Sequence, residues 1–257
     1  MKLFTSTLLP RCKKIVLSKT YFRAIDFMVS INELSLIKKS VNEFKTGKES
    51  EISLVAITVS TGYSDLLEYL VPKNLKYFDN WLFVTDIDDL KTQEILARFP
   101  QVEVILFSFK TVGRIFNKGK AIRKAQKVAY KKYPKSWYLL LDSDILLSQE
   151  FSTMREVLPH LKSDILYGCK KRLDFNKMSN LKNVEKFYLY QHMNEIHGYF
   201  QLHKLKYLYR DSIDASWCDL QFSNHFENKI LLDFFSCYHL GVKGNWTGRK
   251  SIDFIFD

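Results

Sequence analysis

The stretch LLLDSDILL, residues 139–147, decides how the rest of the chain is interpreted. Asp142 and Asp144 leave the end of an apolar run and are followed at once by further apolar residues. Burying one carboxylate is costly, and a close pair costs more unless a cation or hydrogen-bond donors compensate. Carboxylate oxygens suit Mg²⁺ or Mn²⁺ better than Zn²⁺. The pattern therefore predicts a divalent-metal site at a strand end; the alternative is an aspartate that caps the next helix.

Apolar runs and helical segments alternate upstream of this stretch. Strands are predicted over residues 52–59, 81–85, 102–107 and 137–141, with helices over 64–71, 92–99 and 118–132 between them. Nearly continuous β-branched and apolar runs are typical of strands buried on both faces. The alternation predicts an α/β fold with a mostly parallel central sheet flanked by helices, which binds ligands at the carboxyl ends of its strands.

The composition excludes several classes of protein. The 257 residues are 46% hydrophobic and 26% charged, which excludes global disorder. No apolar run reaches the roughly 18 residues of a membrane span, and the N-terminus lacks the features of a signal peptide. The four cysteines are far apart and form no CxxC pair, which argues against a zinc site or a disulfide framework. We therefore expect a cytoplasmic protein.

Basic residues concentrate in one segment. The chain has 39 basic and 28 acidic residues, a net charge of +11, and residues 110–135 contain ten basic residues and no acidic one. This segment predicts contact with the phosphate groups of a nucleotide, of a nucleic acid or of an anionic membrane surface, and its alternative is a solvated helix face. No recognised nucleic-acid-binding module accompanies it, so a specific nucleic acid partner is not expected.

Several motifs, in order, resemble those of metal-dependent glycosyltransferases of the GT-A fold. They are the segment 57–92, FNKGKA (116–121), YLLLDSDI (138–145), GYFQLH (198–203), WCDLQF (217–222) and HLGVKGNWTGR (239–249). The resemblance implies a Rossmann-like fold, a nucleotide-sugar donor, with a UDP-sugar favoured, and a glycan or other hydroxyl acceptor. Helical spacing of apolar residues predicts a helical extension over residues 1–50. The resemblance divides the rest of the chain into a nucleotide-binding half (51–147) and an acceptor-binding half (148–257).

The resemblance also implies a set of site residues. Metal ligands would be Asp142, Asp144 and His239, with Mn²⁺ or Mg²⁺ as cofactor. Residues that would bind the nucleotide-sugar lie at strand ends and at the start of the basic helix: Val59, Thr61, Tyr63, Asp86, Lys118, Lys120, Arg123, Asp142 and Ser143. Residues that would bind the acceptor or close the site are Gly198, Tyr199, Gln201, Trp217 and Arg249.

Asp219 is the candidate general base, if the enzyme inverts the anomeric configuration. It matches the last residue of the family's x-E-D element, although Cys218 replaces the usual Glu. We expect Asp219 just before a helix over 220–227, where the helix dipole would keep the carboxylate ionised.

Two other functions compete with sugar transfer. A metal-dependent nucleotidyltransferase also places carboxylates at strand ends, but it usually carries a glycine-rich loop after the first strand. Here that position reads STGYSD, residues 60–65, with one glycine. A basic protein that binds nucleic acid or a membrane surface without catalysis is the other alternative, and salt-dependent binding without a metal requirement would support it.

Overall fold

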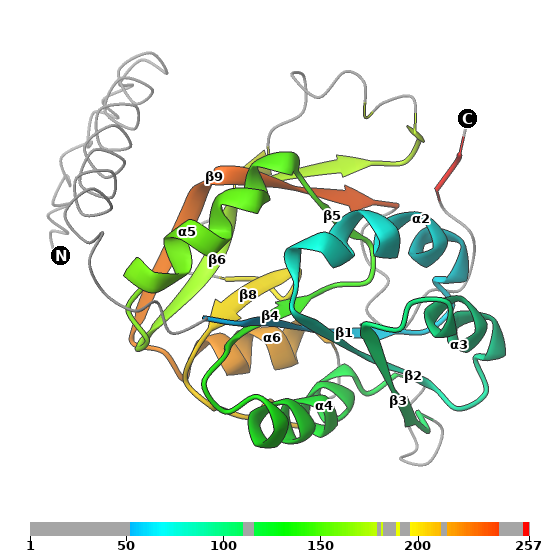
Figure 1. The fold of residues 1–257 in the computed structure, drawn as a ribbon, viewed down its shortest axis with the longest axis horizontal. Coiled ribbons are helices and arrows are strands. Elements are labelled where there is room, and N and C mark those ends of the chain that lie inside the picture. The colour runs from blue at the N-terminus through cyan, green and yellow to red at the C-terminus, as the bar shows by residue number, and fades with distance from the viewer. Residues whose placement is uncertain are drawn as a thin grey trace, which may run out of the picture. The chain divides into compact units, whose positions relative to one another are not determined.

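The computed structural model describes residues 52–109, 116–178, 181, 189–190, 196–211, 215–241 and 254–256. The helical extension predicted over residues 1–50 lies outside these residues. The described part contains one large sheet with helices on both faces (Figure 1).

The first half of the sheet is built by strand–helix alternation. Its elements are β1 (Leu54–Ser60), α2 (Ser64–Asn74), the 3₁₀ helix η1 (Leu75–Tyr77), β2 (Asn80–Asp86), α3 (Leu90–Ala97), β3 (Val102–Phe107), α4 (Lys118–Lys132) and β4 (Trp137–Leu141). The strands lie in the order β3-β2-β1-β4, and each neighbouring pair is parallel. This half has the Rossmann-like arrangement predicted from the sequence.

The second half adds a mixed extension to the same sheet. Its elements are β5 (Ile145–Leu147), η3 (Gln149–Thr153), α5 (Met154–Val157), η4 (Leu158–His160), β6 (Ile165–Phe175), β7 (Leu189–Tyr190), β8 (Phe200–His203), α6 (Ala215–Ser223) and β9 (Asn228–Leu240). The order continues as β4-β8-β6-β9-β5, with β8 antiparallel to β4 and β6, β9 parallel to β6, and β5 antiparallel to β9. The predicted α/β class is confirmed, since strands alternate with helices in the first half and the second half extends the same sheet.

Two hydrophobic clusters, one on each face, hold the helices against the sheet. Along β1, Leu54 and Ala56 belong to one cluster, while Val55 and Ile57 belong to the other. This period of two follows from the pleat of a strand, and here both faces are covered. Helices α2, α3 and α5 pack on one face, and α4 and α6 on the other (Figure 1).

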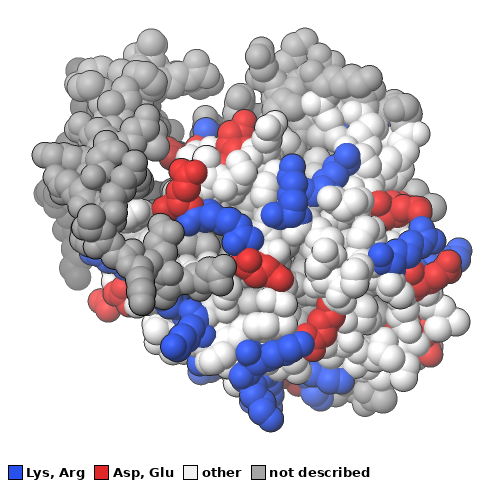
Figure 2. All heavy atoms as spheres, viewed as in Figure 1, with Lys and Arg blue, Asp and Glu red and all other residues white. Residues whose placement is uncertain are grey.

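The basic segment is largely the solvent face of α4. The helix buries Ala121, Ile122, Ala125 and Ala129. It exposes Lys120, Arg123, Lys124, Lys127, Lys131 and Lys132. Lys132 pairs with Glu103 at 2.7 Å. Figure 2 shows a face on which basic and acidic side chains are interspersed. Within the described part of the chain, no helix combines the length and apolar character needed to cross a membrane.

Candidate functional site

The Asp142–Ser143–Asp144 turn follows β4 at the carboxyl edge of the parallel strands. Because Leu141 pairs with Phe200 in the sheet, the turn before β8 reaches the same edge, and Asp142 N donates to Tyr199 O at 3.3 Å. On the other side, Leu240 N donates to Asp144 O at 2.8 Å, at the end of β9. The Asp142–Asp144 turn is therefore held by hydrogen bonds on both sides, to the turn before β8 and to the end of β9.

One buried lysine joins two carboxylates beside this turn. Lys118 Nζ lies 2.7 Å from Asp142 Oδ1 and 3.0 Å from Asp219 Oδ2. Lys118 is the first residue of α4, and Asn117 caps the helix by accepting from Lys120 N at 3.0 Å. Burial lowers the pKa of Lys118, but the charges of Asp142 and Asp219 raise it well above its usual value. We call Asp142, Lys118, Asp219 and Tyr209 the lysine cluster.

The environment of Asp219 suits a proton acceptor. The Tyr209 hydroxyl lies 3.1 Å from Asp219 Oδ1 and also donates to Gln201 Oε1. Burial raises the pKa of Asp219 to about 6, although Lys118 lowers it, and Asp142 adds to the increase. At neutral pH the group is therefore ionised, yet its pKa is close enough to neutrality for efficient proton transfer.

The predicted position of Asp219 relative to its helix is wrong. Helix α6 spans Ala215–Ser223, so Asp219 lies inside it and not before a helix over 220–227. The helix begins earlier because Cys218, fully buried, packs in the hydrophobic cluster under α4. Burial and the Lys118 charge, in place of a helix dipole, set the ionisation of Asp219.

Gly198 lies directly against the general-base candidate. A Cβ added to Gly198 would be 1.9 Å from Asp219 Oδ2 and 2.0 Å from its Cγ, closer than atoms can approach. The backbone of the turn before β8 therefore lies directly against the Asp219 carboxylate. Only glycine leaves room for Asp219 in its observed position.

A second cluster surrounds the other aspartate of the turn. Asp144 Oδ2 lies 3.4 Å from His239 Nε2, and His239 Nδ1 lies 3.2 Å from Asp174 Oδ1. Arg172 Nε lies 2.9 Å from the same Asp174 oxygen. We call Asp144, His239, Asp174 and Arg172 the histidine cluster. It is assembled by the sheet, since Asp174 on β6 and Ile145 on β5 are both register partners of His239 on β9.

Charge coupling within the histidine cluster shifts two pKa values in opposite directions. Burial lowers the pKa of His239, but Asp144 and Asp174 raise it to about 9. Burial raises the pKa of Asp144, but His239 and Arg172 lower it below its ordinary value. In the absence of a metal, the pair is therefore an imidazolium and a carboxylate.

The three predicted metal ligands do not come together. Among the described residues, no group of three or more His, Cys, Asp and Glu side chains is arranged to hold a metal ion. Asp142 pairs with Lys118, whereas Asp144 and His239 are neighbours. Asp144 Oδ2 and His239 Nε2 lie 3.4 Å apart as an ion pair, and they are the two predicted metal ligands that lie side by side. Asp144 Oδ1 is also buried without a hydrogen-bond partner, so it could accept a ligand bond to a cation.

The other residues predicted to bind the nucleotide-sugar differ in burial and lie on several elements. Val59 and Tyr63 are buried in the two hydrophobic clusters, and Thr61 is partly exposed. Asp86 ends β2, and its side chain accepts from Asp88 N at 3.1 Å. Lys120 and Arg123 are exposed on α4, and Ser143 is buried in the turn. Their contacts with a nucleotide stay predictions.

Two predicted acceptor-site side chains have protein partners instead. Tyr199 donates its hydroxyl to Cys169 O at 2.6 Å. Gln201 Nε2 donates to the carbonyl oxygens of Ile196 and Asp219, at 2.9 and 3.1 Å. Both side chains are buried, as Asp219 is, and their contacts with the acceptor stay predictions.

The remaining two acceptor-site predictions stay open. Trp217 is 53% exposed on α6, two residues before Asp219. Arg249 lies outside the described residues.

Sequence reasoning missed Tyr209, Asp174 and Arg172. The spacing of Arg172 and Asp174, two residues apart in RLDF, was an available signal, since it places both on one face of a strand. Tyr209 carries no such signal, because it follows β8 in a segment without regular structure.

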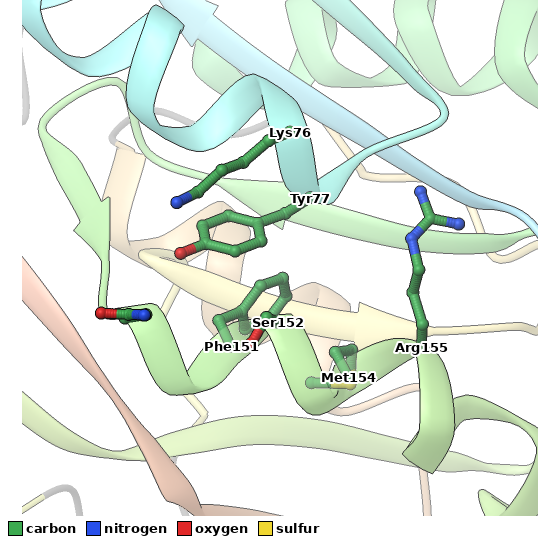
Figure 3. Close-up of a pocket in the computed structure, with 7 residues that line it drawn as sticks. Lys76, Tyr77, Phe151, Ser152, Met154 and Arg155 are labelled. Atoms are coloured by element: carbon green, nitrogen blue, oxygen red, sulfur yellow. The ribbon is translucent and has the colours of Figure 1, made fainter.

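A groove of about 290 Å³ lies elsewhere, between η1 and the η3–α5 segment (Figure 3). Its lining residues are Lys76, Tyr77, Gln149, Phe151, Ser152, Met154 and Arg155. Arg155 pairs with Asp79, whose backbone N–H bonds to Leu54 at the start of β1. The groove is thus near the amino end of β1, and none of the predicted site residues line it.

A scan against protein-family models and a search of curated proteins find no match. Among solved structures, the chain is similar to a 4-diphosphocytidyl-2C-methyl-D-erythritol synthase, with 10% identity and a TM-score of 0.39 over 72% of this chain and 89% of that chain. It is also similar to the enzyme of that name from Anaerococcus prevotii, with 14% identity and a TM-score of 0.44 over 79% and 95%. The fold assignment rests on the chain's own strand order and registers.

Proposed function

We propose that the protein is a metal-dependent glycosyltransferase that moves a sugar from a nucleotide-sugar, with a UDP-sugar favoured, to a hydroxyl group of a glycan or other acceptor. The observation that carries the proposal is the buried Asp219 carboxylate, linked through Lys118 to the Asp142–Asp144 turn. A hydroxyl acceptor must lose its proton during sugar transfer, and a carboxylate with a pKa of about 6 is suited to take it.

Each cluster has a distinct task in this proposal. Asp144 and His239 would hold Mn²⁺ or Mg²⁺, which when bound supplies positive charge to the departing diphosphate. Asp142 would accept hydrogen bonds from ribose or sugar hydroxyls. Asp219 would take the acceptor's proton while the acceptor oxygen bonds to the anomeric carbon. The bond from that carbon to the diphosphate oxygen breaks, and a nucleoside diphosphate leaves.

Nucleotidyl transfer is the second candidate, because a buried Lys118 beside Asp142 would equally suit a nucleoside triphosphate. The loop after β1 argues against it. Its one glycine, Gly62, has a φ of 74° and donates its N–H to Asp89 Oδ2 at 2.8 Å. That backbone N–H group is therefore engaged and does not point to a phosphate.

Product analysis separates the candidates. The purified chain is incubated with a panel of UDP-, GDP- and other nucleotide-sugars, and with nucleoside triphosphates plus sugar phosphates, in Mn²⁺, Mg²⁺ or EDTA. We expect metal-dependent release of a nucleoside diphosphate from one donor, lost in Asp144→Ala and retained in the exposed control Asp164→Ala. Release of pyrophosphate would establish nucleotidyl transfer instead. No release and no metal-dependent donor binding would overturn both and favour the basic surface-binding alternative.

A further inference from the structure

Helix α4 carries a row of cations along its solvent face. Lys120, Arg123, Lys127 and Lys131 are all exposed, and their spacing of three and four residues places them on one side of the helix. From Lys120 to Lys131 the row extends about 16 Å along the helix axis. The helix contains no acidic residue, and none of the four has an ion-pair partner among the described residues. We call these four residues the basic stripe.

The segment after β8 borders the basic stripe on one side. Tyr207 O accepts hydrogen bonds from Gln126 Nε2 at 3.2 Å and from the Tyr130 hydroxyl at 2.8 Å. These bonds hold the segment along α4, where Lys206 and Arg210 add two exposed cations. Tyr207 itself is 38% exposed. The positive surface is therefore wider than the helix alone.

Helix α6 adds an exposed tryptophan beside the first turn of α4. A Cβ added to Gly119 would lie 3.1 Å from Cys218 Cβ, so the two helices are in contact at this point. Trp217, next to Cys218, is 53% exposed. Lys118 of the lysine cluster lies at the same end of α4. We use the name basic–aromatic surface for the basic stripe together with Lys206, Tyr207, Arg210 and Trp217.

This combination of side chains matches the headgroup region of an anionic lipid bilayer. Each lysine or arginine near anionic headgroups strengthens binding by about fivefold. Tryptophan and tyrosine are enriched at bilayer surfaces, because the ring is apolar while its N–H or O–H group stays hydrated. The basic–aromatic surface presents both kinds of side chain on the same side of the sheet, the side that α4 and α6 cover (Figure 1).

Nucleic acid fits the same surface less well. On its other side α4 is bordered by β3, where Lys132 pairs with Glu103 at 2.7 Å. Because α4 is bordered on both sides, it does not stand free to enter a major groove about 12 Å wide. Single strands are held by rings on which bases stack, but one face of the Tyr207 ring is already stacked on His225, with ring centroids 5.2 Å apart.

We infer that the basic–aromatic surface binds the protein to the headgroups of an anionic lipid bilayer, with the basic stripe on the anionic groups and Trp217 among the headgroups. The inference goes beyond the proposed function and does not depend on it. Binding by this surface would bring the lysine cluster close to the bilayer, since Lys118 begins the same helix.

Co-sedimentation with vesicles tests the surface. The protein is mixed with phosphatidylcholine vesicles, with or without phosphatidylserine, in EDTA and without any nucleotide-sugar. We expect binding only with phosphatidylserine, and binding that weakens as salt is raised. Lys127→Gln/Lys131→Gln removes two charges of the basic stripe and should bind about 10- to 30-fold more weakly.

A matched control removes the same charge from the other face of the sheet. Lys73→Gln/Lys91→Gln changes two exposed lysines of α2 and α3, and its binding should differ from the wild type by less than about twofold. Thermal unfolding verifies that each variant is folded. Equal losses in the two variants would show that net charge and not this surface attracts the protein, and would overturn the inference.

Fluorescence places Trp217 relative to the bilayer. Vesicles that contain phosphatidylserine and brominated phosphatidylcholine quench a tryptophan that reaches the lipid, and Trp81 and Trp137 are buried in the protein. We expect quenching that falls in Trp217→Phe. Quenching that is unchanged in this variant would overturn the assignment of binding to this face.

A nucleic acid arm completes the test. Fluorescence anisotropy with a labelled single-stranded RNA and a labelled duplex DNA, in the same buffer, should show weaker binding than phosphatidylserine vesicles. Tighter binding to nucleic acid that is lost in Lys127→Gln/Lys131→Gln would overturn the inference in favour of a nucleic acid partner. Binding to neither would show a solvated helix face. Each of these failures leaves the proposed function standing, because product analysis measures that function without any bilayer.

Discussion

Asp142 and Asp144 belong to one three-residue turn, yet they have different cationic partners. Asp142 pairs with Lys118, and Asp144 pairs with His239. Lys118 has a pKa well above its usual value and keeps its proton, so it is a permanent charge and not a metal ligand. His239, with a pKa of about 9, can give its proton up to a competing cation.

The difference shows how one motif can separate two tasks. A metal ion can replace the proton of His239, but it cannot replace Lys118 without leaving a buried ammonium unpaired. In the proposed function a metal would therefore bind on the Asp144 side, and the lysine cluster would be left for hydrogen bonding and proton transfer. The two side chains also differ in exposure: 32% of the Asp142 side chain is accessible, against 12% of the Asp144 side chain. Asp142 is therefore the more open of the two to hydrogen bonds from a substrate.

The largest expected effect comes from removing the base of the lysine cluster. Asp219→Asn should lower kcat by roughly 10²- to 10⁴-fold, because the amide cannot accept the acceptor's proton. In the wild type, kcat/KM should fall about tenfold per pH unit below pH 6, since a base must be ionised and the pKa of Asp219 is raised to about 6.

The pH profile is measured with the donor identified by product analysis. The residual activity of Asp219→Asn should lack the acidic limb. A variant with wild-type kcat, or one that keeps the acidic limb, would remove Asp219 from the role of base.

The next effect is on stability. Lys118→Met leaves the buried Asp219 carboxylate and the partly buried Asp142 carboxylate without their shared cation, which should lower the free energy of unfolding by roughly 3–5 kcal/mol. Lys120→Met is the matched control, two residues further along the same helix but exposed, and should change it by less than about 0.5 kcal/mol. Urea unfolding at neutral pH measures both. Equal, small changes would show that Lys118 is not the cation that makes burial of Asp219 tolerable.

The sequence predicted the first half of the fold better than the second. Strands β3 and β4 and helix α4 begin and end at the residues that the apolar patterns predicted. A continuous apolar run indicates a buried strand, and apolar residues at helical spacing indicate a helix with one buried face. Strands β6, of 11 residues, and β9, of 13 residues, lie in the second half, for which no strand boundaries were predicted. Charged and polar residues interrupt the apolar pattern of β6, and three of them, Lys171, Arg172 and Asp174, are only partly buried.

For the site, the sequence identified five of the eight residues of the two clusters but not their pairing, and it missed Tyr209, Asp174 and Arg172. The strand-end aspartates stand out because charge follows a buried run. Lys118 and Asp219, however, are 101 residues apart, and no spacing rule connects them. Asp142 and Asp144 have different partners, and which partner each one meets depends on the order of β8, β6 and β9 in the sheet. That order is a tertiary property and leaves no local signal.

The smallest effect tests whether the turn before β8 acts on the lysine cluster. Gly198→Ala places a Cβ where the Asp219 carboxylate lies, so the carboxylate must move away from Lys118 and Tyr209. A displacement of about 1 Å at a reacting group can cost about 10²-fold, and we expect a kcat loss of that size with little change in donor binding. A loss in donor binding alone would place Gly198 on the donor side instead.

A double-mutant cycle isolates the cause. If Gly198→Ala works through Asp219, it should cost almost nothing further in an Asp219→Asn background, since neighbouring sites that share one function are not additive. Full additivity would mean that Gly198 affects the acceptor directly. In the Asp144→Ala background, by contrast, any residual rate should still fall about 10²-fold, because the histidine cluster does not contain the displaced carboxylate. Non-additivity with Asp219 and additivity with Asp144 would together show that the lysine cluster and the histidine cluster serve separable tasks.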